Sequence, residues 1–286
     1  MKVAIIGSTG QLGSDLRDIF SDSHEVYPLS HNEIQVENID SVNSVISSIK
    51  PDVILNTAAF HVVPMCEQKP DASYSINALG SLNVARVSQD LGSVYVYYST
   101  DYVFDGKKNK PYVENDCPCP LNVYGSTKLA GEYYALNYCD KGIVIRVSGI
   151  YGKVPCRAKG GNFITTMIKL AKEKNEVRVV ADEVLTPTPT FEIARSTLSL
   201  LSKKDAFGLF HMTSEGECSW YEFASVIFDT LKLETPLVKA RVKDFPMVVR
   251  RPIYSVLENR GLKTLGIQEL PNWKESLINF LKRYYS

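Results

Sequence analysis

The sequence predicts an α/β fold built on a doubly wound, mostly parallel sheet, with a smaller mixed α/β part toward the C-terminus. Short apolar, β-branched runs alternate with longer helical segments through the first half of the 286-residue chain. This alternation requires crossover connections, which place helices on both faces of a parallel sheet. It ends near Gly149, so the remaining chain is expected to form a second, smaller part. Ligands of such sheets bind beyond the carboxyl ends of the strands.

Hydrophobic spacing predicts the elements. Runs of apolar and β-branched residues predict strands at residues 3–6, 25–29, 52–56, 94–98 and 143–147. Helical spacing predicts helices at residues 11–20, 39–49, 71–91 and 124–138. Beyond Gly149 we expect helices at residues 162–174, 220–233 and 273–284, and a strand at residues 177–180 that returns to the sheet.

Composition excludes several kinds of partner. The 32 basic and 32 acidic residues balance, so no net charge favours nucleic acid or an anionic membrane. The apolar N-terminal run is too short for a signal peptide and no later run could span a bilayer, which predicts a cytoplasmic protein. The six cysteines show no metal-ligand spacing, so we expect reduced thiols and no bound metal.

A glycine-rich turn opens the first predicted helix. Residues 7–13, Gly-Ser-Thr-Gly-Gln-Leu-Gly, come directly after the first strand. Glycines allow a tight turn and close approach of the backbone to a pyrophosphate, which the N-terminus of the helix also favours. The turn therefore predicts a Rossmann-type dinucleotide site, whose expected contacts are Gly7, Gly10, Gln11, Leu12 and Gly13.

The ends of the second and third strands predict further cofactor contacts. Ser30 and His31 follow the second strand, where an acidic residue often binds the ribose hydroxyls of NADH. No carboxylate stands directly after this strand, which favours NADPH, while Glu33 is close enough to keep NADH as an alternative. Small residues after the third strand would let a dinucleotide lie across its end, and the expected contacts there are Thr57, Ala58, Ala59 and Phe60.

These contacts suggest how the chain divides by role. Residues 1–148, with about 177–200, are expected to form the NAD(P)-binding domain, since they contain the alternating elements and a returning strand. Residues 149–176 and 201–286 are expected to form the substrate-binding part.

A tyrosine and a lysine four residues apart predict the chemical end of the site. Tyr124 and Lys128 share one face at the start of a predicted helix. A free tyrosine has a pKa of about 10, and a nearby ammonium and nicotinamide cation would lower it. A hydroxyl at the end of the fourth strand would bond the same substrate oxygen, and we favour Thr100 over its neighbour Ser99.

Other chemistries lack the residues they need. The four histidines have no Gly-x-Ser-x-Gly nucleophile turn near them. Asp182 and Glu183 could suggest paired carboxylates, but neighbours on a strand point to opposite faces. An oxidoreductase with a nicotinamide cofactor is therefore the prediction.

Several runs point to one family. Residues 99–106, Ser-Thr-Asp-Tyr-Val-Phe-Asp-Gly, are the most specific, and the likeness continues through residues 7–13, 51–59, 111–114, 124–132, 219–224, 251–252 and 270–273. Together these runs resemble the dTDP-4-dehydrorhamnose reductases almost from end to end. The resemblance implies hydride transfer from NADPH or NADH to the C4 keto group of a nucleotide-linked 6-deoxy sugar.

The resemblance also implies roles for single residues. Tyr124 would be the proton donor, Lys128 would lower its pKa and hold the nicotinamide ribose, and Thr100 would aid the substrate carbonyl. Asp101 and Tyr102 would lie near the sugar. Extended dehydrogenases often dimerise, so a homodimer is expected as well.

The substrate pyrophosphate would need cations. Guanidinium groups suit phosphate, and the candidates are Arg157, Lys159, Arg250 and Arg251. Arg251 is favoured because it belongs to the matching Arg-Pro pair, and it completes the expected substrate contacts with Thr100, Asp101, Tyr102 and Tyr124.

The chain departs from the family near the expected sugar. Residues 149–152, Gly-Ile-Tyr-Gly, lack a tryptophan that the family often uses there, and residues 182–188 differ as well. These changes favour a different sugar over loss of activity. One alternative is an epimerase or dehydratase of the same fold that keeps its NAD bound, although Asp101 is the single carboxylate beside Thr100. Another is a non-catalytic NADP-binding regulatory subunit, like that of methionine adenosyltransferase.

Overall fold

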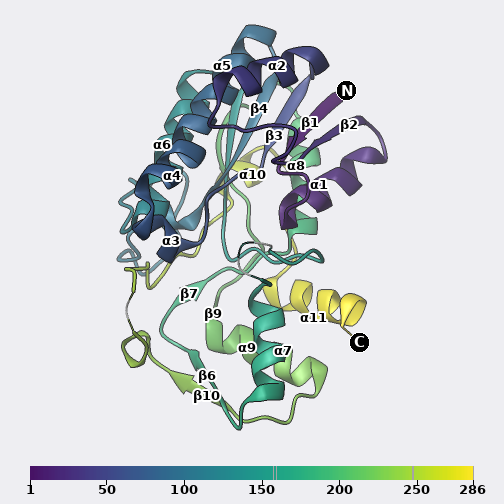
Figure 1. Ribbon diagram of the computed structural model, residues 1–286. Helices are drawn as coiled ribbons and strands as arrows, with labels where there is room; N and C mark the ends of the chain where they lie inside the picture. Colours follow the sequence, from purple (N-terminus) through teal and green to yellow (C-terminus); the bar gives the residue numbers. More distant parts are fainter. Residues whose placement is uncertain (157, 159, 247, 286) are drawn as a thin grey trace.

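A six-stranded sheet forms one lobe of the molecule, a computed structural model that describes residues 1–156, 158, 160–246 and 248–285 (Figure 1). The strand order is β2-β1-β3-β4-β5-β8, and every pairing is parallel. The strands are β1 (Lys2–Ile6), β2 (Glu25–Leu29), β3 (Val53–Asn56), β4 (Val94–Thr100), β5 (Gly142–Val147) and β8 (Gly208–His211). The chain winds outward from β1 in both directions, which confirms the predicted doubly wound fold.

Helices cover both faces of this sheet. On one face lie α1 (Gln11–Ser21), α8 (Thr190–Leu201) and α10 (Arg260–Thr264), and on the other lie α2 (Ile39–Ile49), α5 (Gly80–Leu91) and α6 (Val123–Asn137). Successive side chains of a strand point to opposite faces. Val3 and Ile5 accordingly pack under α1, while Ala4 and Ile6 pack under α2 and α5. Burial on both faces explains why β1 is apolar over its whole interior.

The helix predicted for residues 71–91 is interrupted. After α3 (Val63–Gln68), the chain forms α4 (Pro70–Tyr74), a single π-helical turn (Ser75–Leu79) and then α5. A π turn inserts one extra residue into a helix and re-aims the side chains around it. Asn77 lies in this turn and is fully buried.

The second lobe is built around aromatic side chains. It contains α7 (Phe163–Glu173), α9 (Trp220–Leu231) and α11 (Trp273–Tyr284). Two small sheets complete it: β6 (Val177–Val180) pairs in parallel with β10 (Leu237–Ala240), and β7 (Val184–Leu185) pairs antiparallel with β9 (Cys218–Ser219). Short 3-10 turns occur at η2 (Asp101–Val103) and η4 (Val242–Asp244).

Three details of the C-terminal half differ from the sequence analysis. A strand at residues 177–180 is present, but its expected return to the large sheet was wrong, since β6 pairs with β10 in the second lobe. The sixth strand is instead β8, which was not predicted. The helix α8 was also not predicted, and it packs against α1 through Ile193 and Ala194. Of the helices in the described part of the chain, none has the length and apolar character needed to cross a bilayer.

Candidate active site

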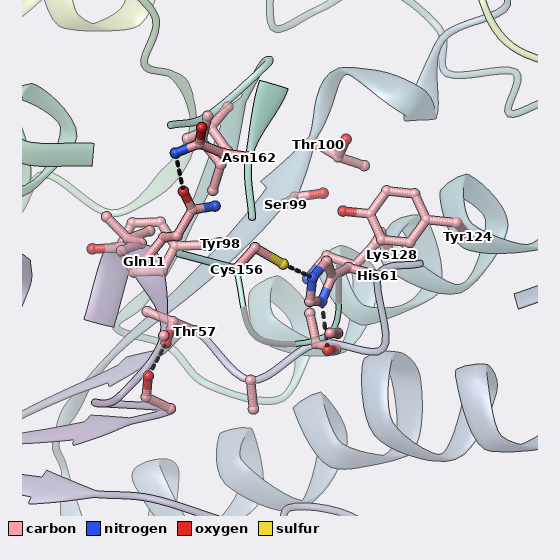
Figure 2. A pocket seen from close by; sticks show the side chains of 18 of the residues that line it. Gln11, Thr57, His61, Tyr98, Ser99, Thr100, Tyr124, Lys128, Cys156 and Asn162 are labelled. Atoms are coloured by element: carbon pink, nitrogen blue, oxygen red, sulfur yellow. Dashed lines mark hydrogen bonds between the residues drawn. The ribbon is translucent and has the colours of Figure 1, made fainter. Parts of the chain in front are cut away.

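The carboxyl ends of the central strands open into a cavity of about 740 Å³ between the two lobes (Figure 2). It brings together most of the predicted cofactor, catalytic and substrate residues: Gly7, Gly10, Gln11, Leu12, Ser30, His31, Thr57, Ala58, Ala59, Thr100, Asp101, Tyr102, Tyr124 and Lys128. Gly13, Phe60 and Arg251 do not line it. The topological rule for parallel sheets therefore located the cavity correctly.

The glycine turn fits a dinucleotide because side chains are absent from it. Gly7 has a φ of +78°, and a Cβ there would lie 2.5 Å from Thr57 Oγ1. A Cβ on Gly13 would lie 2.2 Å from the Gly7 carbonyl oxygen, so Gly13 serves the close packing of α1 and not the cavity wall. Gly10 precedes α1 and provides no side-chain cap. The first N–H groups of α1 are thus available to an anion such as a pyrophosphate.

The carboxylate of Glu33 lies at the end of β2, close to the strand as the sequence indicated. The Glu33 carboxylate accepts hydrogen bonds from the Ser30 N–H, at 2.7 Å, and from the Ser30 hydroxyl. These bonds lower the pKa of Glu33, so the group is charged at neutral pH. Ser30 and His31 line the cavity beside it. This corner therefore offers groups that suit ribose hydroxyls.

Phe60 does not line the cavity, but Asn77 of the π turn fixes its backbone. Asn77 Oδ1 accepts from the Phe60 N–H at 2.8 Å, and Asn77 Nδ2 donates to the Phe60 carbonyl at 2.9 Å. The same amide donates to Thr127 Oγ1 on α6 at 3.0 Å. One buried side chain thus holds the loop after β3 against the helix that contains Lys128.

Tyr124 and Thr100 meet at the chemical end. Tyr124 lies in the first turn of α6, which Asn122 caps by accepting from the Gly125 N–H at 2.8 Å. Burial raises the pKa of Tyr124, and the neighbouring Thr100 side chain opposes that rise. Burial outweighs the effects of the side chains around Tyr124, and the lowering by a nearby ammonium and nicotinamide cation stays a prediction. The phenol stays protonated at neutral pH, which suits a proton donor.

Lys128 is buried on the same face of α6. It is 2% exposed, and its Nζ lies 3.9 Å from the centre of the Tyr97 ring. Burial lowers the pKa of Lys128 to about 7, with the charge of Glu132 acting in the opposite direction. Glu132 itself is paired with Arg146 through Oε2 and Nη2 at 2.6 Å. The ammonium of Lys128 is therefore poorly compensated and is placed to gain from a ligand that offers oxygen acceptors or negative charge.

Asp101 organises the hydroxyls next to Tyr124. Its carboxylate accepts from Ser255 at 2.6 Å, from Ser148 at 2.9 Å and from Thr100 at 3.0 Å. Burial raises the pKa of Asp101, and these hydroxyl donors oppose the rise. Asp101 therefore acts on the site chiefly by fixing Thr100, while its own side chain is almost fully buried.

Arg251 lies at the edge of the site and not in its wall. It is exposed, yet its charge acts on two buried groups: burial raises the pKa of Tyr102 and of Glu183, and the charge of Arg251 opposes both rises. The Trp220 side chain, which does line the cavity, also opposes the rise in the pKa of Glu183. Arg250 is exposed as well, and Arg157 and Lys159 lie outside the described residues.

Several cavity residues were not predicted as contacts: His61, Cys156, Asn162, Phe163 and Trp220. Asn162 Nδ2 reaches Gln11 Oε1 at 3.5 Å, which links the second lobe to α1 (Figure 2). Trp220 belongs to a run that matched the family, and this match was the available signal. Within the described part of the chain, no cluster of His, Cys, Asp and Glu could hold a metal ion.

A glycine turn at the start of a parallel sheet, with Thr100, Tyr124 and Lys128 in the same cavity, defines an NAD(P)-dependent oxidoreductase of the extended short-chain class. Residues 1–286 match the family described as RmlD substrate binding domain. The chain belongs to this family, the dTDP-4-dehydrorhamnose reductases.

Individual relatives are similar to this chain over nearly its whole length. The spore coat polysaccharide biosynthesis protein SpsK of Bacillus subtilis is 36% identical over 282 residues, covering 98% of this chain and 97% of that protein. A solved dTDP-4-dehydrorhamnose reductase from Clostridium acetobutylicum is 37% identical, with a TM-score of 0.94 and 99% of each chain covered. Another, from Bacillus anthracis in complex with NADP, is 35% identical, with the same TM-score and coverage.

Proposed function

We propose that this protein is an NADPH-dependent reductase of the C4 keto group of a nucleotide-linked 6-deoxy sugar. The observation that supports this most is that Thr100 and Tyr124 lie together, with Lys128 one helical turn further on, in the cavity that the glycine turn also lines (Figure 2). The relatives named dTDP-4-dehydrorhamnose reductase, one of them solved with NADP, favour the same reaction.

The cofactor would lie along the strand ends. The N-terminus of α1 would hold its pyrophosphate, Ser30 and His31 its adenosine ribose, and Lys128 its nicotinamide ribose. Bound in this way, the reduced nicotinamide supplies a hydride to the carbonyl carbon. NADH is the alternative cofactor, since the Glu33 carboxylate lies at the end of β2.

The proton would come from Tyr124. Because burial raises its pKa, the phenol holds its proton at neutral pH and can give it to the carbonyl oxygen as the alcohol forms. Thr100 would donate to the same oxygen by turning its one hydroxyl hydrogen away from Asp101, while the Tyr102 N–H donates to Thr100 Oγ1 and keeps it in place. Lys128 would stabilise the phenolate that remains after transfer.

The second lobe would cover the sugar nucleotide. We assign dinucleotide binding to residues 1–148 together with α8, β8 and α10, which pack with the large sheet, and substrate binding to the remaining C-terminal segments. Tyr102 would contact the sugar and Arg251 the pyrophosphate. Trp220 offers an aromatic surface in the cavity, although the sequence lacks the tryptophan expected at residues 149–152.

Cofactor oxidation tests this proposal directly. Purified protein is mixed with NADPH or NADH and a panel of 4-keto-6-deoxy sugar nucleotides, starting with the dTDP sugar, and absorbance of the reduced nicotinamide is followed. We expect oxidation with at least one sugar, and NMR then gives the stereochemistry of the product. No oxidation with any sugar would overturn the proposal. Tightly bound NAD after purification would then favour an epimerase, and co-purification with a larger enzyme would favour a regulatory subunit.

The proposal includes two features of the protein in its setting. We propose a homodimer, which light scattering of the purified protein would test. We also propose a cytoplasmic location, which cell fractionation would test.

A further inference from the structure

A thiol and an imidazole meet inside the cavity, outside the group formed by Thr100, Tyr124 and Lys128. Cys156 and His61 both line it, and Cys156 Sγ lies 3.0 Å from His61 Nε2. The two residues are 95 positions apart and come from different connections, one after β3 and one after β5. In Figure 2 the sulfur points directly at the ring.

The backbone fixes which ring nitrogen faces the sulfur as an acceptor. His61 Nδ1 lies 3.1 Å from the carbonyl oxygen of Ala59. A carbonyl oxygen accepts but cannot donate, so Nδ1 has the hydrogen in the neutral ring. Nε2 then presents its lone pair to Cys156, and the thiol is the donor. A nucleophile, a base and a group that orients the base are thus joined by successive hydrogen bonds.

The other cysteines have different surroundings. Cys66 donates to the Phe60 carbonyl at 3.4 Å, and burial raises the pKa of both Cys139 and Cys218. Cys117 and Cys119 are exposed on the connection before α6. Among the hydrogen bonds of the described residues, the one between a cysteine and an imidazole belongs to Cys156.

We propose that Cys156 is a thiol-modification site in the cavity. Its thiol exchanges with low-molecular-weight disulfides, and His61 acts as the base. The Cys156 proton passes to His61 Nε2, and the thiolate attacks one sulfur of the disulfide. A new S–S bond forms as the old one breaks, and the leaving thiolate takes the proton back from His61. The thiolate is the reacting form of a cysteine, so a neighbouring base raises the rate.

The adduct would stand in the space that the cofactor and sugar need. Cys156 is 7% exposed and lines the same cavity as Gln11 and Tyr124, so an attached group must extend into that cavity. Modification therefore blocks turnover, and a thiol reductant restores it. Labelling of Cys156 is measured without any substrate, so its outcome is separate from that of the reductase proposal.

The experiment uses 4,4′-dithiodipyridine, which releases a coloured product for each thiol that reacts. The exposed thiols are removed first in a Cys117→Ser/Cys119→Ser variant. At pH 6.5 we expect one fast-reacting thiol, located at Cys156 by peptide mass spectrometry, and its loss in the additional Cys156→Ser variant. Adding His61→Gln should slow the fast reaction about tenfold, because Gln bonds sulfur but cannot take its proton. Unchanged speed in His61→Gln, or a fast phase that persists in Cys156→Ser, would overturn the proposal.

A second comparison needs no change at His61. The Cys117→Ser/Cys119→Ser protein is labelled at pH 6.5 both native and unfolded in urea, where Cys156 has no imidazole beside it. We expect native Cys156 to react about tenfold faster than the same residue in the unfolded chain, although it is less exposed. Slower labelling in the native protein would show an ordinary buried thiol and would contradict the proposal.

Discussion

The two ends of the cavity are built by opposite means. At the glycine turn, backbone groups do the binding, and the site depends on atoms that are missing at Gly7 and Gly10. At the proton-donor end, side chains do the binding and the chemistry, and they are held by hydrogen bonds or by burial, as Thr100 is by the Asp101 carboxylate. Cofactor binding at the glycine turn should therefore be weakened by added atoms, and turnover at the proton-donor end by removed atoms.

The largest effect is expected from removing one oxygen at the proton-donor end. Tyr124→Phe should lower kcat by about 10²–10⁴-fold, the usual contribution of a general acid, and should leave NADPH affinity almost unchanged. NADPH oxidation and fluorescence titration of NADPH measure the two quantities. Tyr134→Phe is the matched control, since Tyr134 lies on the same helix and its hydroxyl meets Tyr74 on the surface. Equal losses in both variants would contradict the assignment.

Adding one carbon at the glycine turn should come next. An alanine at Gly7 would need a φ of +78° and would place Cβ 2.5 Å from Thr57 Oγ1. We expect NADPH affinity to fall by about tenfold or more, because the turn must shift away from the pyrophosphate. Gly92→Ala is the control: its φ is +68° with nothing within 4 Å. That variant should lose about 1–2 kcal/mol of stability and keep its NADPH affinity.

The pH dependence of NADPH affinity should distinguish the two ends, because Lys128 takes up a proton when the cofactor binds. The pKa of Lys128 is about 7 in this structure, and a bound cofactor with negative phosphates raises it. Bound protein therefore holds more protons than unbound protein above pH 7, so NADPH affinity should fall as pH rises, by at most about tenfold per pH unit. Titration calorimetry in buffers of different ionisation enthalpy would detect the proton uptake. Lys128→Met should bind more weakly with little change between pH 7 and 9; an equal slope in that variant would rule out Lys128 as the source.

The smallest effect is expected at the rim. Arg251→Met should raise the KM for the sugar nucleotide about three- to tenfold, in keeping with one exposed charge-assisted contact, and should not alter NADPH affinity. Arg250→Met is the neighbouring control, because Arg250 is also exposed and its carbonyl, not its side chain, accepts from Asn122. A similar rise in both variants would indicate a general charge effect.

The first half of the fold was predictable because its signals are local. The strands from β1 to β5 are short apolar runs, and their order of connection forces a parallel sheet. The glycine turn and the pair Tyr124 and Lys128 are also local patterns, since each lies within seven residues. Local spacing therefore predicted the sheet and the cavity at its edge, and most of the site residues that it named lie in the cavity wall.

The C-terminal half depends on longer-range pairing, which local spacing does not contain. A strand at residues 177–180 was correctly expected, but its choice of β10 over the large sheet is made by tertiary contacts. The sixth strand, β8, has four residues and begins at a glycine, so it gave little signal. The helix α8 begins directly after Pro189, in a Thr-Pro-Thr-Pro-Thr run typical of a loop.

Within the site, the residues that sequence analysis missed are those joined across large separations. Asn162 reaches Gln11 over 151 positions, and Cys156 reaches His61 over 95. Neither pair has a spacing that a helix or strand would explain. The electrostatics of Tyr124 were also beyond the sequence, because they depend on side chains that folding brings around it, among them Cys66 and Thr100.

The two hydrogen bonds between the Asn77 side chain and the Phe60 backbone restrict the motion of the loop after β3. This loop has no regular secondary structure at residues 57–62, yet the Phe60 N–H is bonded to a side chain that is fully buried. Amides exchange with deuterium only when such bonds open. The Phe60 amide should therefore exchange as slowly as the amides of the strands, although it lies in an irregular loop. The floor of the cofactor site would then be rigid before any ligand arrives.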